Sequence, residues 1–213
     1  MSEQHIKNGV YLVLDPGMEL DKLQQQLVKI SSCELSAIQI WDNMQHMQEE
    51  EINEVFDVVF DIFGGKNIPI LINNRWEYLN DRPFDGVHFD HIPLFFEHIV
   101  EQIKRPFLKG LTLNNDLSVV SVAEKYGFSY FSFCSMFSSQ TSNSCEIVHP
   151  ETIKTCRQKT EIPIFVAGGI TPQNLHLLND LDYNGVALIS GIMKAENPVE
   201  QLSKYTQQLN LSK

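Results

Sequence analysis

The chain alternates short apolar runs with longer segments that mix apolar and polar residues. The runs are rich in Val, Ile, Leu and Phe, and they do not alternate strictly with polar residues. Strands that are buried on both faces have this composition, as in a parallel sheet covered by helices. Eight such runs are present: Val10–Leu14, Ala37–Trp41, Pro69–Ile72, Gly86–Phe89, Leu108–Leu113, Tyr130–Cys134, Pro163–Val166 and Gly185–Ile189.

The segments between the runs carry apolar residues at helical spacing. Proline follows a capping residue at Thr171-Pro172 and at Asn197-Pro198, a pattern that predicts a helix start at each pair. Three apolar stripes predict helices: Leu20 to Ile30, Ile52 to Phe63 with the stop signal Gly64-Gly65, and Leu117 to Ala123 with the stop signal Gly127.

Eight strand–helix units in 213 residues predict a single (β/α)₈ TIM barrel that occupies residues 1–213. A doubly wound sheet would also alternate strands and helices, but it usually has a glycine-rich first turn. The first turn here is Asp15-Pro16-Gly17-Met18, without the GxGxxG pattern. No stretch has the composition of a linker, so the sequence predicts one domain.

The last two strands end in small, glycine-bearing turns. Backbone N–H groups at such turns suit a phosphate dianion, and barrels commonly hold phosphate after strands seven and eight. We therefore expect phosphate contacts from Gly168, Gly169, Ile189 and Ser190; the alternative is a pair of ordinary buried strands with helix-start glycines. The polar stretch 135–143 is either a ligand loop or a solvated connection, and its Thr141 is a further phosphate candidate.

Composition narrows the classes of partner. The formal net charge is −11 and no basic stripe exists, which disfavours nucleic acid and anionic membranes. The N-terminus lacks an apolar leader, and no apolar run is long enough to cross a bilayer, so we expect a cytoplasmic protein. Its expected partner is a phosphorylated small molecule, and the sequence leaves a homodimer open.

Six motifs, in the right order over nearly the whole chain, resemble the thiamine-phosphate synthase and thiazole tautomerase (TenI-like) family. They are Tyr11-Leu-Val-Leu-Asp15, Ile38-Gln-Ile40, Ile72-Asn-Asn-Arg75, Asp85-Gly-Val-His88, Val166-Ala-Gly-Gly-Ile170 and Gly185-Val-Ala-Leu-Ile-Ser190. The resemblance implies thiamine biosynthesis, and transferase chemistry that joins a pyrimidine diphosphate to a thiazole phosphate and releases pyrophosphate. It also implies Mg²⁺, held by carboxylates, if the chain is catalytically active.

The chain departs from the family pattern at its charged positions. Trp41 and Asn43 stand where the family has Arg and Lys, and Asn74 replaces the metal-binding Asp of the Asn-Asp-Arg turn. Pro93 falls at the second Asp, and Ser142 at the lysine of the sixth loop. Each missing charge-assisted contact is worth about 1.5–3 kcal/mol, so the diphosphate would be poorly compensated. The tautomerase branch uses a histidine in the fifth loop, where Asn114 stands.

Several polar residues remain candidates for the site. Arg75 either enters the pocket or pairs with a carboxylate, Trp41 either stacks on a heteroaromatic ring or plugs the mouth, and His88 either enters the pocket or supports a strand end. Asp90 is the metal candidate, with Asp15 as its partner in a rearranged magnesium site. The catalytic candidates are Gln39, Asn74, Thr112 and Asn114, and the pocket candidates are Gln39, Trp41, Asn43, Asn73, Asn74, Arg75 and His88.

Three functions fit these observations. The first is a family barrel that binds a thiazole phosphate, with synthase chemistry weak or absent. The second is a competent Mg²⁺-dependent synthase with a rearranged diphosphate site. The third is a non-catalytic binding or regulatory protein that keeps the fold and the phosphate site.

Overall fold

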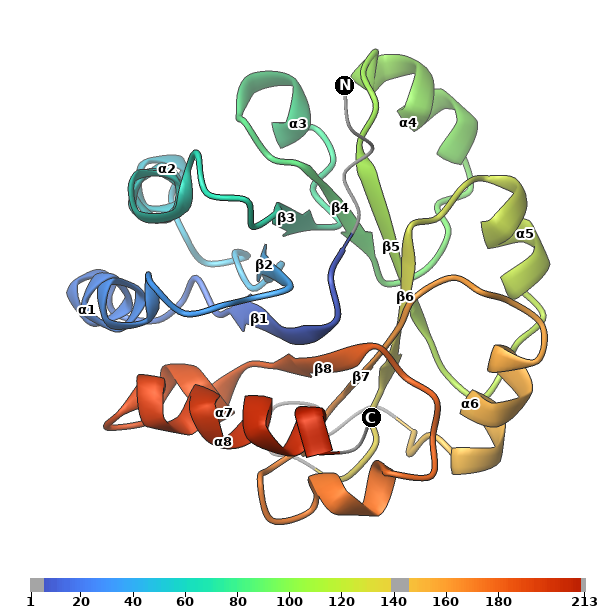
Figure 1. Ribbon diagram of the computed structural model, residues 1–213. Helices are drawn as coiled ribbons and strands as arrows, with labels where there is room; N and C mark the ends of the chain where they lie inside the picture. Colours follow the sequence, from blue (N-terminus) through green and yellow to red (C-terminus); the bar gives the residue numbers. More distant parts are fainter. Residues whose placement is uncertain (1–5, 139–145, 212–213) are drawn as a thin grey trace.

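The computed structural model describes residues 6–138 and 146–211, and it forms a closed barrel of parallel strands in sequence order (Figure 1). Each strand pairs with its neighbours in the chain, and β8 closes the barrel on β1 through pairs such as Gly9 with Gly185. The strands are β1 (Gly9–Leu14), β2 (Ala37–Ile40), β3 (Ile70–Asn73), β4 (Gly86–Phe89), β5 (Leu108–Leu113), β6 (Tyr130–Cys134), β7 (Ile164–Ala167) and β8 (Gly185–Leu188). The predicted (β/α)₈ TIM barrel is confirmed.

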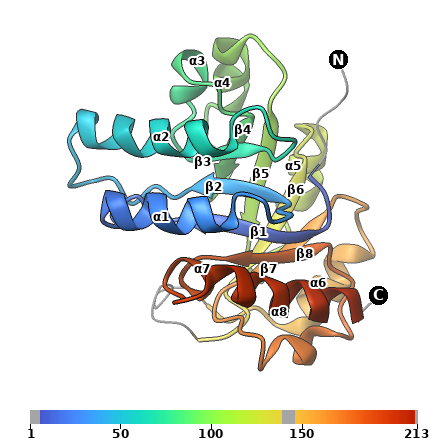
Figure 2. The same cartoon turned by 60° about the vertical axis from the view of Figure 1, so that its left-hand side comes forward.

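Helices surround the strands (Figure 1), and α1 lies between α2 and α8 on the outer surface (Figure 2). The helices are α1 (Leu20–Ile30), α2 (Glu49–Phe63), α3 (Tyr78–Asp81), α4 (Phe96–Ile103), α5 (Val120–Lys125), α6 (Pro150–Arg157), the 3₁₀ helix η1 (Leu175–Leu178), α7 (Ser190–Met193) and α8 (Pro198–Leu211). Within the described residues, no helix is long and apolar enough to cross a membrane.

Most helix signals in the sequence match the structure. The helix predicted at Asn197-Pro198 is α8, where the Asn197 side chain accepts the Glu200 N–H at 3.2 Å. The signal at Thr171-Pro172 is only partly confirmed: Thr171 Oγ1 accepts the Asn174 N–H at 3.3 Å, as a helix cap does, but the chain continues as turns and the short η1. The Asn174 side chain accepts the Thr171 N–H at 2.8 Å, which completes a reciprocal cap, and donates to the Gly169 carbonyl at 2.9 Å.

The pleat of the strands divides the core into two layers. Outward residues such as Leu12, Ile38 and Val186 pack under the helices, whereas the alternate residues fill the barrel. The interior cluster contains Tyr11, Val13, Ala37, Leu71, Leu108, Tyr130, Phe165 and Ala187. Trp41, Ala167 and Ile189 are partly buried and pack against this cluster at the carboxyl ends of the strands. These ends meet at one edge, so the loops that follow them form the mouth of the barrel.

Candidate functional site

A continuous chain of hydrogen bonds crosses the interior just below the mouth. The Tyr11 hydroxyl donates to Gln39 Oε1 at 2.7 Å and lies 2.6 Å from the Tyr130 hydroxyl. His88 Nδ1 lies 2.9 Å from the Tyr130 hydroxyl, and His88 Nε2 lies 2.9 Å from Thr112 Oγ1. Three of the sequence candidates, Gln39, His88 and Thr112, are therefore joined through two tyrosines, and these five residues are called the polar chain below.

Sequence reasoning missed Tyr11 and Tyr130 as parts of the site. Both side chains are fully buried, and burial raises the pKa of each phenol, so both stay protonated at neutral pH. A tyrosine at an inward position of a barrel strand must find a polar partner, and that requirement is the signal available in the sequence. Which partner it finds depends on strands far apart in the chain.

Gly110 of β5 makes room for the polar chain. Gly110 pairs with His88 on β4 and with Tyr130 on β6. A Cβ atom at this position would lie 2.2 Å from the Tyr130 hydroxyl and 2.6 Å from His88 Nδ1. Glycine therefore lets side chains from β4 and β6 meet across the strand between them.

His88 is neutral at physiological pH. Its side chain is buried, and burial lowers its pKa from 6.5 to about 4, while the nearby Asp90 carboxylate opposes the shift. A neutral imidazole has one donor and one acceptor nitrogen, which fits its place between two hydroxyl groups.

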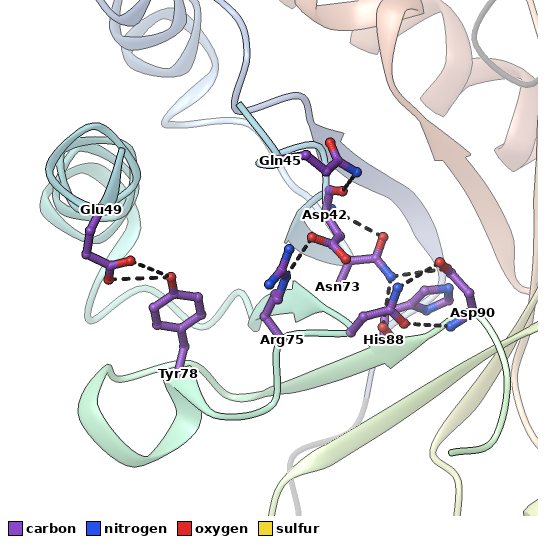
Figure 3. Close-up of polar contacts among 9 residues, drawn as sticks. Asp42, Gln45, Glu49, Asn73, Arg75, Tyr78, His88 and Asp90 are labelled. Carbon is purple, nitrogen blue, oxygen red and sulfur yellow. Dashed lines mark hydrogen bonds and ion pairs between the residues drawn. The ribbon is translucent and has the colours of Figure 1, made fainter. Parts of the chain in front are cut away.

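A second polar group lies at the mouth, on the loops after β2, β3 and β4 (Figure 3). Asp90 accepts hydrogen bonds from Asn73 Nδ2 at 3.1 Å and from Asn74 Nδ2 at 2.8 Å, and its own N–H donates to Asn74 Oδ1 at 3.0 Å. Asn74 adopts a left-handed backbone with φ of 56°, which asparagine tolerates better than most residues. This network fixes all three side chains to one another.

Arg75 forms an ion pair with Asp42, with 2.7 Å between Nε and Oδ1. The pair is partly exposed and ties the loop after β3 to the loop after β2 (Figure 3). Of the two alternatives in the sequence, the pairing of Arg75 with a carboxylate is the one the structure contains. Asn43, a pocket candidate, donates to Asp15 Oδ1 at 2.8 Å on the neighbouring loop.

The residues at the mouth do not fit a magnesium site. In the described part of the chain, no group of three or more His, Cys, Asp or Glu side chains is placed to hold a metal ion. Both Asp90 oxygens accept amide hydrogens, and Asp15 Oδ1 accepts from Asn43 and from the Gly17 N–H. The donor set around Asp90 thus supplies one carboxylate and two amides that are already hydrogen-bonded to it, a poor match for a hard divalent cation.

The turns after β7 and β8 lie at the same mouth. Gly168 and Gly169 have φ of 87° and 65°, a conformation that side chains with a Cβ rarely adopt. A Cβ on Gly169 would also lie 2.7 Å from the carbonyl oxygens of Phe137 and Ser138, so the loop after β6 packs directly against this turn. Ile189 follows the last strand directly as the N-cap residue of α7, and Ser190 begins that helix.

The remaining candidates that the structure describes do not belong to the polar chain or to the network around Asp90. Asn114 is exposed, and its side chain accepts the Asp116 N–H at 2.8 Å in a local turn. Trp41 is partly buried and packs against the barrel interior. Thr141 and Ser142 lie outside the described residues.

Comparison with known proteins identifies the family of this chain. The family model described as thiamine monophosphate synthase matches residues 10–192. The chain belongs to the thiamine-phosphate synthase family. Thiamine-phosphate synthase of Vibrio parahaemolyticus is 26% identical over 192 residues, which are 90% of this chain and 93% of that protein. The enzyme of Methanobrevibacter smithii is 26% identical over 132 residues, 62% of this chain and only 63% of that protein.

A solved structure with the same fold is thiamine phosphate pyrophosphorylase from Pyrococcus furiosus. Its TM-score is 0.78 at 18% identity, and the match covers 98% of each chain. At this identity the likeness establishes the fold alone. Some of the relatives match this chain over less than two thirds of their own length.

Proposed function

We propose that this member of the thiamine-phosphate synthase family binds a thiazole phosphate, and that Mg²⁺-dependent diphosphate transfer is weak or absent. The observation that carries the proposal is the neutralised mouth over β2, β3 and β4. Its arginine is already paired with Asp42, and Asp90 is already bonded to Asn73 and Asn74. A diphosphate would meet no unpaired cation on these loops.

The charge balance of the mouth supports the same conclusion. The loops that follow β1 to β5, all of which the structure describes, contain one arginine and no lysine. They contain six carboxylates: Asp15, Glu19, Asp42, Glu77, Asp90 and Asp116. A leaving diphosphate requires cations to stabilise its developing charge, so an acidic rim opposes the synthase reaction.

The phosphate monoester is assigned to the turns after β7 and β8. The left-handed glycines Gly168 and Gly169 carry no side chains of their own over their backbone N–H groups, and Ser190 is the first residue of α7, two positions after the end of β8. Backbone amides can bind a monophosphate without help from a metal or a lysine. This side of the mouth therefore suits the monoester, in contrast to the acidic side over β1 to β5.

Calorimetry with hydroxyethylthiazole phosphate tests the phosphate assignment, with unphosphorylated hydroxyethylthiazole as the ligand control. Substitution at Gly169 would disturb its contact with Phe137, so the variants are placed at Ser190 instead. Ser190→Glu should weaken binding at least about tenfold by charge repulsion, whereas Ser190→Gln, equal in size and neutral, should weaken it much less. Equal affinities of the two variants for the thiazole phosphate would show that its phosphate does not bind at this turn.

An assay for thiamine phosphate, with both family substrates and Mg²⁺ present, tests the catalytic part. We expect turnover far below that of a typical enzyme. Turnover of about 1 s⁻¹ or more would establish a competent synthase instead. Tight binding of the thiazole phosphate without turnover would agree with the proposal.

A further inference from the structure

The polar chain has a direction, which is set by the orientation of the Gln39 amide. The single hydroxyl proton of Tyr11 is committed to Gln39 Oε1. The short contact between the two tyrosines therefore requires Tyr130 to donate to Tyr11. The Tyr130 oxygen must then accept from His88 Nδ1–H, and His88 Nε2 must accept from the Thr112 hydroxyl.

We infer that Tyr11 and Tyr130 are positioning residues, which lock the tautomer of His88 to the orientation of the Gln39 amide. A reversed chain is equally complete: Gln39 would donate to Tyr11, and His88 would carry its proton on Nε2. Intermediate arrangements leave a buried hydroxyl without an acceptor, which costs about 1–3 kcal/mol. The five residues consequently switch together or not at all.

The direction decides what the barrel offers at its mouth. With Oε1 held by Tyr11, the Gln39 amide retains two N–H donors on Nε2, which have no partner among the described residues. Gln39 is only 5% exposed, so these donors serve a ligand better than bulk water. At the other end, Thr112 has given its proton to His88, and its oxygen is left as an acceptor.

The site thus presents donors on the β2 side and an acceptor on the β5 side. A ligand that matches it carries a hydrogen-bond acceptor, such as a ring nitrogen, toward Gln39 and a donor toward Thr112. Binding of a ligand to the Gln39 amide and the Thr112 oxygen rests on the proposed function. The direction of the hydrogen bonds in the polar chain is a property of the protein without a ligand.

Nitrogen-15 NMR of the imidazole rings at neutral pH tests the inference without any ligand. The chain has seven histidines, and the signals that disappear in His88→Gln identify His88. The wild-type protein should show the Nδ1–H tautomer. Because no ligand is used, failure of this test would leave the proposed function standing, and failure of thiazole phosphate binding would leave this test standing.

The decisive variant is Tyr11→Phe, because the Tyr11 hydroxyl does not contact His88. Without that acceptor, the Tyr130 proton turns to His88 Nδ1, and the imidazole should change to the Nε2–H tautomer. Gln39→Met should give the same change from the far end of the chain. Gln39→Glu keeps an acceptor for Tyr11 and should retain the wild-type tautomer.

Tyr205→Phe is the matched control. Tyr205 is a buried tyrosine that does not belong to the polar chain, and its hydroxyl donates to the Ile170 carbonyl at 3.0 Å. It should leave the His88 signals unchanged. An Nε2–H tautomer in the wild type would overturn the inference. So would an unchanged tautomer in a folded Tyr11→Phe or Gln39→Met variant, and either variant alone is sufficient if the other does not fold.

Discussion

Asn74 and Asp90 lie side by side at the mouth, with 2.8 Å between Asn74 Nδ2 and Asp90 Oδ2. The family pattern has a metal-binding aspartate where Asn74 stands, and the amide turns that position into a hydrogen-bond donor. The amide donates a hydrogen bond to the Asp90 carboxylate, whereas an aspartate at this position would repel it.

Asn74→Asp should convert this contact into a cation-dependent one. Two carboxylates at hydrogen-bonding distance repel each other, so we expect a loss of about 1–2 kcal/mol in the free energy of unfolding without divalent cations. Millimolar Mg²⁺ should recover most of the loss, because paired carboxylates bind this ion. Thermal unfolding in EDTA and in MgCl₂ measures both effects.

Asn74→Gly is the control for that experiment. Glycine accepts the φ of 56° and removes the same side-chain hydrogen bonds, but it adds no charge. Its unfolding temperature should not respond to Mg²⁺. If Asn74→Asp likewise showed no response, the two positions would not be close enough to share a cation.

Burial of His88 predicts a pH dependence of stability. The folded protein holds the pKa of His88 at about 4, whereas the unfolded chain restores 6.5. Between these values the unfolded state binds more protons, so the free energy of unfolding rises as the pH increases from 4 to 6.5. Above pH 6.5 the contribution of His88 to stability is fully present. The contribution is about 3 kcal/mol.

Denaturant unfolding between pH 4 and pH 7 measures this contribution as the difference between the wild type and His88→Gln. The variant loses hydrogen bonds at every pH, but it lacks the titrating group. Parallel stability curves for the two proteins would contradict the prediction.

Gly110→Ala should destabilise the barrel by about 3 kcal/mol, because the new methyl group would lie 2.1 Å from Tyr130 Cζ and would push the polar chain apart. Urea unfolding measures the loss. Gly17→Ala is the control, since its Cβ would meet the ends of two side chains, Asp15 Oδ1 at 3.3 Å and Asn43 Nδ2 at 3.5 Å, and it should change stability by about 0.5 kcal/mol or less. Equal decreases in the free energy of unfolding for the two variants would show that the Tyr130 side chain moves aside without an energetic cost.

The strands were predictable from sequence because they are short, mainly apolar runs, most of whose residues are buried. The start of α8 was predictable for a similar local reason, since its cap and its proline are adjacent in the chain. Thr171-Pro172 carries the same signature and a reciprocal cap with Asn174, yet only the short η1 follows it. The length of a helix depends on the packing of its later turns, which a two-residue signal does not contain.

The candidate site divides in the same way. Gln39, His88 and Thr112 were recognisable as polar residues at strand positions, but the tyrosines that join them were not, because Tyr11 and Tyr130 are 119 residues apart in sequence. Arg75 had two sequence interpretations, and only the folded loops bring Asp42 within 2.7 Å of it.

By itself, the sequence determined the barrel, the order of its units, the family and the loss of charge at the mouth, because these depend on local composition and on motifs read along the chain. The tertiary structure alone decided which polar groups neutralise one another and which side chains the interior hydrogen bonds join. Those properties arise from strands that closure of the barrel brings together, and a hydrogen bond forms only where that closure places donor and acceptor within about 3 Å.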